Sequence, residues 1–202
     1  MSAKIVTFKI TGLTPLLMHN PAAMLNKSDA GPGVKRIPTP EEEAERGLYR
    51  TADGQLYIPS GAFRSAIIGK GGSASGRKIG KFSANSRVAA GMFVVEERTL
   101  LIHAKTGKPL TDHDYEIDVR RAVIQGNGVL RARPKISDWS CLLALEIDED
   151  FVTIDQVALL LNIAGKASGV LDYRPQCKGT FGRFVAELVQ DEPAKPAGAK
   201  KR

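Results

Sequence analysis

The sequence is poor in the residues that build metal centres and disulfide scaffolds. It contains two cysteines and three histidines among 202 residues. Cys141 and Cys177 do not stand at a metal-ligand spacing, and two thiols do not make a disulfide framework, so we expect a reducing, cytoplasmic setting. The histidines are also scattered, with none at a ligand spacing from another. We therefore expect no metal, no cofactor and no catalytic residues.

Long apolar runs are missing too. No stretch approaches the roughly 18 apolar residues of a membrane-spanning helix. The chain also begins without a signal-peptide pattern, because Lys4 is followed at once by an alternating strand. Hydrophobic content of 43% and charged content of 25% are typical of a soluble globular protein. We expect no membrane contact, one domain over residues 1–190, and a disordered basic tail over 191–202.

Acidic residues are absent from one long segment. Between Pro59 and Val95 the charged residues are all basic: Arg64, Lys70, Arg77, Lys78, Lys81 and Arg87. The segment reads as the end of a short strand followed by a helix, and we expect Ser60 to accept hydrogen bonds from the first helical N–H groups. A helix start also favours anions such as phosphate. With a net charge of +7, this segment predicts a surface that holds a polyanion.

Periodicity predicts the main elements of the fold. Alternating apolar residues indicate a half-buried first strand, and Thr153 with Gln156 forms a capping box that opens a second helix. A long insertion over 21–55 contains an acidic run after Pro40 that could begin a short helix. The expected strands cover residues 4–10, 92–102, 139–147 and 184–189, and the expected main helices begin near residues 60 and 153.

A hairpin insertion is expected within residues 112–138. Strands over 117–124 and 129–133 flank a Gly-Asn-Gly turn, which supplies the positive φ angles of a tight hairpin. No acidic residue occurs between positions 119 and 135, and the arms carry Arg120, Arg121, Arg131, Arg133 and Lys135. Arginine makes bidentate phosphate contacts, so the arms suit a phosphate backbone. The alternative is an exposed hairpin that its charge keeps soluble.

A glycine-rich loop over 165–184 follows the second helix. It interleaves aromatic and basic side chains, namely Lys166, Tyr173, Arg174, Lys178, Phe181 and Arg183. Basic and aromatic residues in this pattern suit neutralisation of a nucleic-acid backbone combined with stacking of bases.

Two motifs carry a family resemblance. The stretch YIPSGAFRSAI at 57–67 resembles the opening of the first helix in the RAMP superfamily, the Cas5, Cas6 and Cas7 proteins of CRISPR effectors. The glycine-rich loop before the last strand resembles the same family, and Cas7 is the nearest branch. Both the resemblance and the element order indicate an α+β, ferredoxin-like or RRM-like fold, β-α-β-β-α-β, with a long insertion after the first strand and a β-hairpin insertion.

The resemblance implies a non-catalytic backbone subunit of a CRISPR-type ribonucleoprotein. Such a subunit coats guide RNA through phosphate contacts, binds copies of itself head to tail, and joins other effector subunits. The candidate nucleic-acid contacts are Ser60, Arg64, Lys70, Arg77, Lys78, Lys81, Arg87, Arg120, Arg121, Arg131, Arg133, Lys166, Tyr173, Arg174, Lys178 and Phe181.

Three other functions stay open. A phage single-stranded DNA-binding protein would use the same physics, and no residue visibly reads a 2′-hydroxyl to separate DNA from RNA. A Cas6-like, metal-independent endoribonuclease would need a histidine as general acid or base, for which His19 is the best candidate. An assembly protein that binds no nucleic acid is the last alternative.

Overall fold

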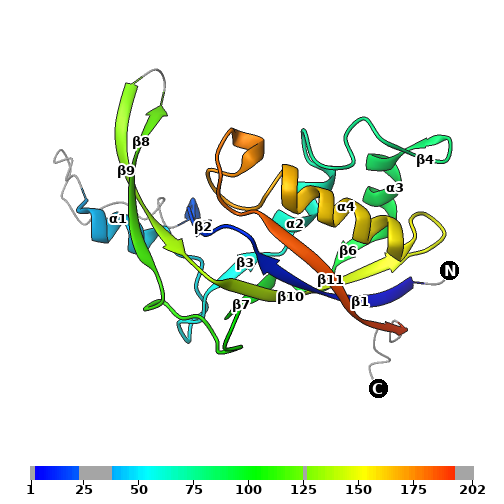
Figure 1. Ribbon diagram of the computed structural model, residues 1–202, viewed down its shortest axis with the longest axis horizontal. Coiled ribbons are helices and arrows are strands. Elements are labelled where there is room, and N and C mark those ends of the chain that lie inside the picture. Colours follow the sequence, from blue (N-terminus) through cyan, green and yellow to red (C-terminus); the bar gives the residue numbers. More distant parts are fainter. Residues whose placement is uncertain (1–2, 23–37, 125–126, 194–202) are drawn as a thin grey trace, which may run out of the picture.

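The described residues form three antiparallel sheets of six, three and two strands, with most of the helices on one face of the largest (Figure 1). The computed structural model describes residues 3–22, 38–124 and 127–193. The larger sheet has six strands in the order β11-β1-β10-β7-β3, with β6 also paired to β10. Its strands are β1 (Ala3–Gly12), β3 (Tyr57–Pro59), β6 (Met92–Val94), β7 (Arg98–His103), β10 (Trp139–Asp148) and β11 (Phe184–Pro193).

Alternation of apolar residues explains the centre of this sheet. Val6, Phe8 and Ile10 of β1 are fully buried, and they pair across the ladder with the buried face of β10. Side chains of a strand point alternately to the two faces of its sheet, so this pattern gives β1 and β10 one core face. The predicted strands over 4–10 and 139–147 are confirmed.

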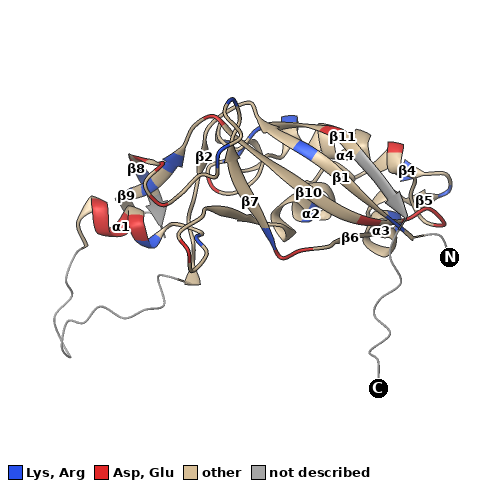
Figure 2. Ribbon diagram, turned by 90° about the horizontal axis from the view of Figure 1, so that it is seen from below, with Lys and Arg blue, Asp and Glu red and all other residues tan. Residues whose placement is uncertain are grey.

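Two helices cover the core face of the large sheet. They are α2 (Gly61–Ile68) and α4 (Ile154–Ala167), and Figure 2 shows the same molecule seen from below. The predicted capping box of α4 is confirmed, since Thr153 Oγ1 accepts from the Gln156 N–H and Gln156 Oε1 accepts from the Thr153 N–H. The ring of Phe63 on α2 meets Phe184 of β11 edge-on at 5.5 Å, which closes the core.

The hairpin belongs to a separate, three-stranded sheet. It consists of β8 (Glu116–Ile124) and β9 (Asn127–Ile136), with β2 (Leu16–Leu17) paired to the far end of β9. The short helix expected after Pro40 is confirmed as α1 (Pro40–Arg46). It packs against β9. The hairpin projects from one end of the molecule, as Figure 1 shows.

The region between α2 and β7 differs from its prediction. The single strand expected over 92–102 is wrong, because β6 and β7 pair with separate halves of β10 and the chain leaves the sheet between them. Two apolar residues followed by Glu96 and Glu97 break the period-2 pattern there, and both glutamates are exposed. Elements that the sequence did not predict precede β6, namely β4 (Lys78–Ile79), β5 (Phe82–Ser83) and α3 (Ala84–Gly91).

The α+β class with antiparallel sheets is confirmed. The strand β11 continues past residue 190, where we expected the tail to begin, and residues 194–202 lie outside the described part of the chain. Residues 23–37 of the predicted insertion and 125–126 of the hairpin turn also lie outside it. Within the described residues, no helix is long and apolar enough to cross a membrane. Those residues also contain no cluster of three side chains suited to a metal ion.

Candidate nucleic-acid interface

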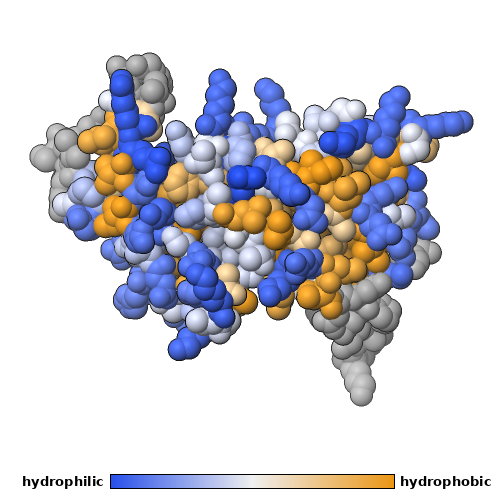
Figure 3. All heavy atoms as spheres, in the orientation of Figure 1, coloured by the Kyte–Doolittle hydropathy of each residue, from blue (hydrophilic) through white to orange (hydrophobic). Residues whose placement is uncertain are grey.

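Exposed lysines gather on the side of the large sheet that carries the helices. They come from the segment 69–83, from α4, and from the glycine-rich loop with its 3₁₀ turn η2 (Pro175–Cys177). We call Lys70, Lys78, Lys81, Lys166 and Lys178 the free lysines, because none has an ion-pair partner among residues 3–22, 38–124 and 127–193. In the orientation of Figure 3, hydrophilic side chains project along the upper edge, where these segments lie in Figure 1.

The segment 69–83 owes its shape to backbone hydrogen bonds. After α2 ends, the N–H groups of Ser73 and Ala74 donate to the carbonyls of Ala66 and Ile67, at 3.0 and 2.9 Å. Gly72 permits this return, since a Cβ there would stand 2.4 Å from the Ile67 carbonyl oxygen. The chain therefore folds back on α2 and then presents the β4–β5 turn outward, with its lysines directed to solvent.

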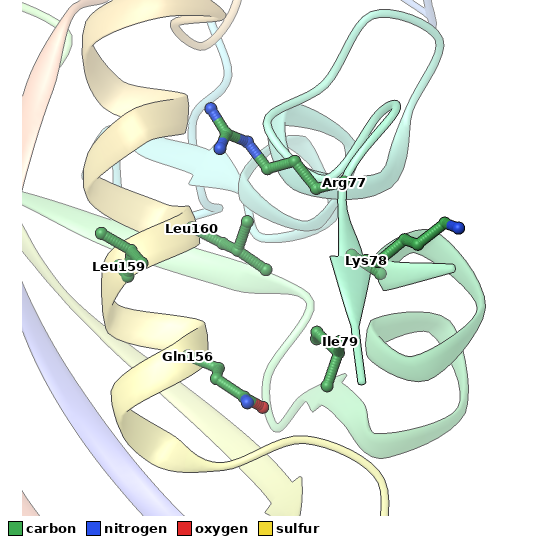
Figure 4. Close-up of a pocket in the computed structure, with 7 residues that line it drawn as sticks. Arg77, Lys78, Ile79, Gln156, Leu159 and Leu160 are labelled. Atoms are coloured by element: carbon green, nitrogen blue, oxygen red, sulfur yellow. The ribbon is translucent and has the colours of Figure 1, made fainter. Parts of the chain in front are cut away.

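A cleft of about 350 Å³ separates this turn from α4. Figure 4 shows Ile79 on one side facing Leu160 and Gln156 on the other, with the guanidinium of Arg77 above them. The Arg77 Nε–H donates to the Ser73 carbonyl at 2.9 Å, which holds the guanidinium at its inner nitrogen. Leu159 also lines the cleft although 62% of it is exposed. The cleft thus combines an apolar floor with cations at its rim.

An exposed aromatic lies beside the cleft. Phe82 is 60% exposed, and Arg87 is placed between it and Phe151, with the guanidinium carbon 5.0 and 5.6 Å from the two ring centroids. These are distances of cation–π contact. Arg87 thus already makes two aromatic contacts within the protein. Phe82 was not among the predicted contacts, although it follows Lys81 in the same basic–aromatic pattern as residues 165–184.

The hairpin arginines are mostly neutralised within the molecule. Arg120 and Arg131 stand directly opposite each other in the strand register, a position where like charges repel. Each has a carboxylate nearby, since Arg120 pairs with Asp118 at 2.5 Å and Arg131 with Glu43 of α1 at 2.8 Å. In the same way Arg133 pairs with Asp172 at 2.6 Å, and Lys135 with Glu116 at 2.5 Å. Arg121 is exposed and packs over Gly128.

The glycine-rich loop meets the hairpin through its aromatic rings. The guanidinium carbon of Arg120 lies 4.8 Å from the ring centroid of Phe181 and 5.7 Å from that of Tyr173. Phe181 is buried, whereas Tyr173 is 41% exposed. Arg174 donates to the Leu171 carbonyl at 2.7 Å and to Gln176 at 3.0 Å, so it holds the loop together. Of these candidates, only the ring of Tyr173 presents a large exposed surface.

The same loop concentrates unusual backbone conformations. Leu171, Tyr173 and Lys178 all have positive φ angles, between 49° and 62°. Left-handed backbone at residues other than glycine costs roughly 1–2 kcal/mol each and is found mostly where the surroundings enforce it. Here the loop is held by the hairpin, through Arg120 over its rings, and by the segment 69–83, since Gln176 donates to the Lys70 carbonyl.

Two further candidates make hydrogen bonds within the protein. The expectation that Ser60 caps α2 is wrong, because its hydroxyl shares a 2.7 Å hydrogen bond with Thr99 and the residue is buried. Arg64 donates to the carbonyls of Ala89 and Met92, at 3.0 and 3.2 Å. The Ala89 carbonyl lies in the last turn of α3, where carbonyls have no helical partner, and Met92 is the first residue of β6. Both side chains already have these partners within the protein.

His19 lies at the base of the hairpin, just after β2. Burial lowers the pKa of its imidazole, and the charges around it are mixed, with Asp172 and Glu43 opposing Arg133 and Arg131. The imidazole is therefore neutral at pH 7. Complete burial raises the pKa of the Cys141 thiol, so this cysteine is a packed side chain, as predicted from its place on the buried face of β10.

The comparison with solved structures finds a chain of similar fold. No family model matches the chain, and no curated protein sequence is similar to it. A chain in the cryo-EM structure of the Type III-B Cmr-beta complex bound to cognate target RNA is similar, with a TM-score of 0.56 and 13% identity over 95% of this chain. The match covers 61% of the Cmr-beta chain, so the present chain spans about three fifths of its length.

The crystal structure of Cmr6 from Pyrococcus furiosus is a second, more distant match. Its TM-score is 0.43 and its identity 13%, over 93% of this chain and all of the Cmr6 chain. At such identities the likeness concerns the fold alone. The resemblance that the sequence motifs indicated is thus confirmed as a structural similarity, in fold, to a chain of the Type III-B Cmr-beta complex.

Proposed function

We propose that this chain is a non-catalytic RNA-binding subunit of a CRISPR-type ribonucleoprotein, and that it coats a guide RNA through the phosphate backbone. The observation that carries the proposal is the set of free lysines on one side of the molecule. Lysine ammonium groups without internal partners are available to neutralise phosphates. The fold supports RNA as the ligand, because a similar chain comes from a complex bound to target RNA.

We propose that the fold is ferredoxin-like. In it, β1, β6 with β7, β10 and β11 are the four strands, and α2 and α4 are the two helices. Three features support this assignment: β1 lies between β10 and β11, β6 and β7 lie on the far side of β10, and all these pairs are antiparallel. The segment 21–55 and the hairpin β8–β9 are then insertions into a single domain.

We also propose that copies bind head to tail in the cytoplasm, together with other effector subunits. The two ends of the molecule are built from different elements and carry different charged segments. The acidic first turn of α1 lies at one end and the basic β4–β5 turn at the other, as Figures 1 and 2 both show. Unlike ends favour a heterologous interface, which repeats along a filament instead of closing into a dimer.

The proposed contacts are fewer than those predicted from sequence. The free lysines, Arg77 and the exposed Arg121 would contact phosphates, and Tyr173 would stack on a base. Arg120, Arg131 and Arg133 are assigned to the fold, since each has a carboxylate partner. The buried or internally bonded candidates, Ser60, Arg64, Arg174 and Phe181, are assigned to the fold as well.

Purification in low and high salt tests the proposal. The absorbance ratio at 260 and 280 nm and the particle size would be recorded before and after separate treatment with RNase and DNase. We expect large, RNase-sensitive particles at low salt. DNase-sensitive particles would instead support a single-stranded DNA-binding protein. A monomer free of nucleic acid under both conditions would contradict the coating of any polymer.

A further inference from the structure

We propose that the cleft between α4 and the β4–β5 turn receives one nucleobase of the bound RNA. This inference rests on the proposed function, in which the same side of the molecule contacts phosphates, and it adds a base-binding subsite to it. The cleft volume of about 350 Å³ lies within the roughly 300–1,000 Å³ of ligand pockets.

The floor of the cleft is apolar and partly exposed. Ile79 and Leu160 face each other across it (Figure 4), and Leu159 lies at its side with 62% of its surface in solvent. Most other apolar residues of α4 point into the core, so an exposed leucine here breaks the helix pattern. The flat face of a nucleobase would remove this apolar surface from water, which is favourable.

The edge of the cleft offers hydrogen-bond donors. Gln156 uses its Oε1 to accept from the Thr153 N–H, so its NH₂ group is turned outward as a donor. Arg77 is held at Nε by the Ser73 carbonyl, which leaves the outer nitrogens of the guanidinium over the cleft. Base edges carry carbonyl and ring-nitrogen acceptors that match these donors.

The arrangement of apolar, hydrogen-bonding and cationic groups in the cleft fits a nucleotide better than a protein side chain. The apolar floor matches the face of a base, and the donors at the edge of the cleft match the edge of the base. The cations at the rim, Arg77 and Lys78, match the phosphate. An aliphatic side chain of a partner protein would use only the floor. Phe82 stands directly opposite Ile79 in the β4–β5 pair and is 60% exposed, so a second base can stack next to the first.

The experiment compares two polymers on the full-length protein. One is a 15-nucleotide oligouridylate, and the other is a 15-unit ribose-phosphate strand of the same charge without bases. We expect the wild type to bind the oligouridylate about tenfold more tightly, because both strands offer the same phosphates and only one offers bases. The ratio of the two dissociation constants is the readout, since a change in electrostatic attraction affects both strands alike.

Matched variants locate the effect. Leu159→Gln keeps the charge and the helix but makes the cleft polar, and we expect it to reduce the tenfold ratio to about twofold. Gln156→Glu keeps the capping box, which accepts either residue, and removes the NH₂ donor. We expect a similar loss of the ratio. The control is Leu142→Gln, which changes a leucine of comparable exposure, 57%, on β10.

Each outcome separates the subsite from the proposed function. A wild type that binds both strands equally overturns the base subsite and leaves phosphate binding intact. A protein that binds neither strand overturns both. An equal loss with Leu142→Gln and Leu159→Gln overturns the location. If Leu159→Gln keeps the ratio but shrinks the particles, the cleft holds a protein side chain, and the base subsite is again overturned.

Discussion

The hairpin β8–β9 and the segment 69–83 carry comparable numbers of basic residues but present them in opposite ways. On the hairpin, Arg120, Arg131, Arg133 and Lys135 all lie within 2.8 Å of a carboxylate. In the segment 69–83, the lysines are exposed and unpaired within the described residues. Basic residues that are close in sequence therefore do not predict how much positive charge reaches the surface.

The difference arises from how each region is held. The hairpin has no core of its own, and ion pairs with Glu43 and Asp172 fasten it to α1 and to the glycine-rich loop. The segment 69–83 is fastened by backbone hydrogen bonds to α2, so its lysine side chains have no structural task. A region that needs its charges for attachment cannot also offer them to a ligand without losing that attachment.

Charge reversal in the segment 69–83 should have the largest effect. The double variant Lys78→Glu/Lys81→Glu should weaken binding to a 15-nucleotide RNA about 100-fold near 0.1 M salt. Two lost phosphate contacts on a single strand should also reduce the slope of log K against log salt by about 1.4. Fluorescence anisotropy across a salt series measures both quantities.

The control for this variant carries the same change in net charge. Lys9→Glu/Lys108→Glu alters two exposed lysines, one on β1 and one in the turn after β7. We expect less than a threefold loss and an unchanged salt slope. Equal losses from the two double variants would mean that net charge alone sets the affinity, and the distinction between the two regions would fail.

Breaking a hairpin ion pair should lower the stability of the protein and not its affinity for RNA. Asp172→Asn removes the partner of Arg133, whose side chain is only 13% exposed. A poorly hydrated guanidinium without a carboxylate is destabilising, so we expect a loss of about 1–2 kcal/mol in the free energy of unfolding. Urea denaturation measures it, with Asp150→Asn at an exposed turn as the control.

RNA binding distinguishes attachment from ligand contact in the same variant. If Arg133 is structural, Asp172→Asn should change RNA affinity less than threefold at temperatures where the protein is folded. A stable Asp172→Asn variant with much altered affinity would place Arg133 in the interface, which would contradict the internal role argued from its contact.

Much of the fold followed from periodicity. The alternation of Val6, Phe8 and Ile10 predicts β1, and the capping box at Thr153 predicts the start of α4. Short elements were not predictable, because two-residue strands such as β4 and β5 have no period to detect. Their pairing depends on the return of the chain over α2, which is a tertiary interaction.

The candidate site was predictable only in part. The lack of acidic residues over 59–95 identified three of the free lysines, Lys70, Lys78 and Lys81. The same reasoning failed for the hairpin arginines, because Glu43 and Asp172 stand 88 and 39 positions away from their partners Arg131 and Arg133. The cleft was missed for a related reason, since its two walls come from residues 77–84 and 156–160.

The smallest predicted effect tests whether the hairpin side has a catalytic role. Burial lowers the pKa of His19, so the unfolded chain binds a proton more readily than the folded protein does. The free energy of unfolding should therefore fall as the pH drops below about 6.5, and His19→Gln should flatten that fall. His113→Gln is the matched control, because 93% of that side chain is exposed.

RNA incubated with the wild type or with either of these variants should stay intact from pH 6 to 8. RNA cleavage that disappears in His19→Gln and persists in His113→Gln would make His19 a general base or acid. The hairpin side of the molecule would then contain an active site.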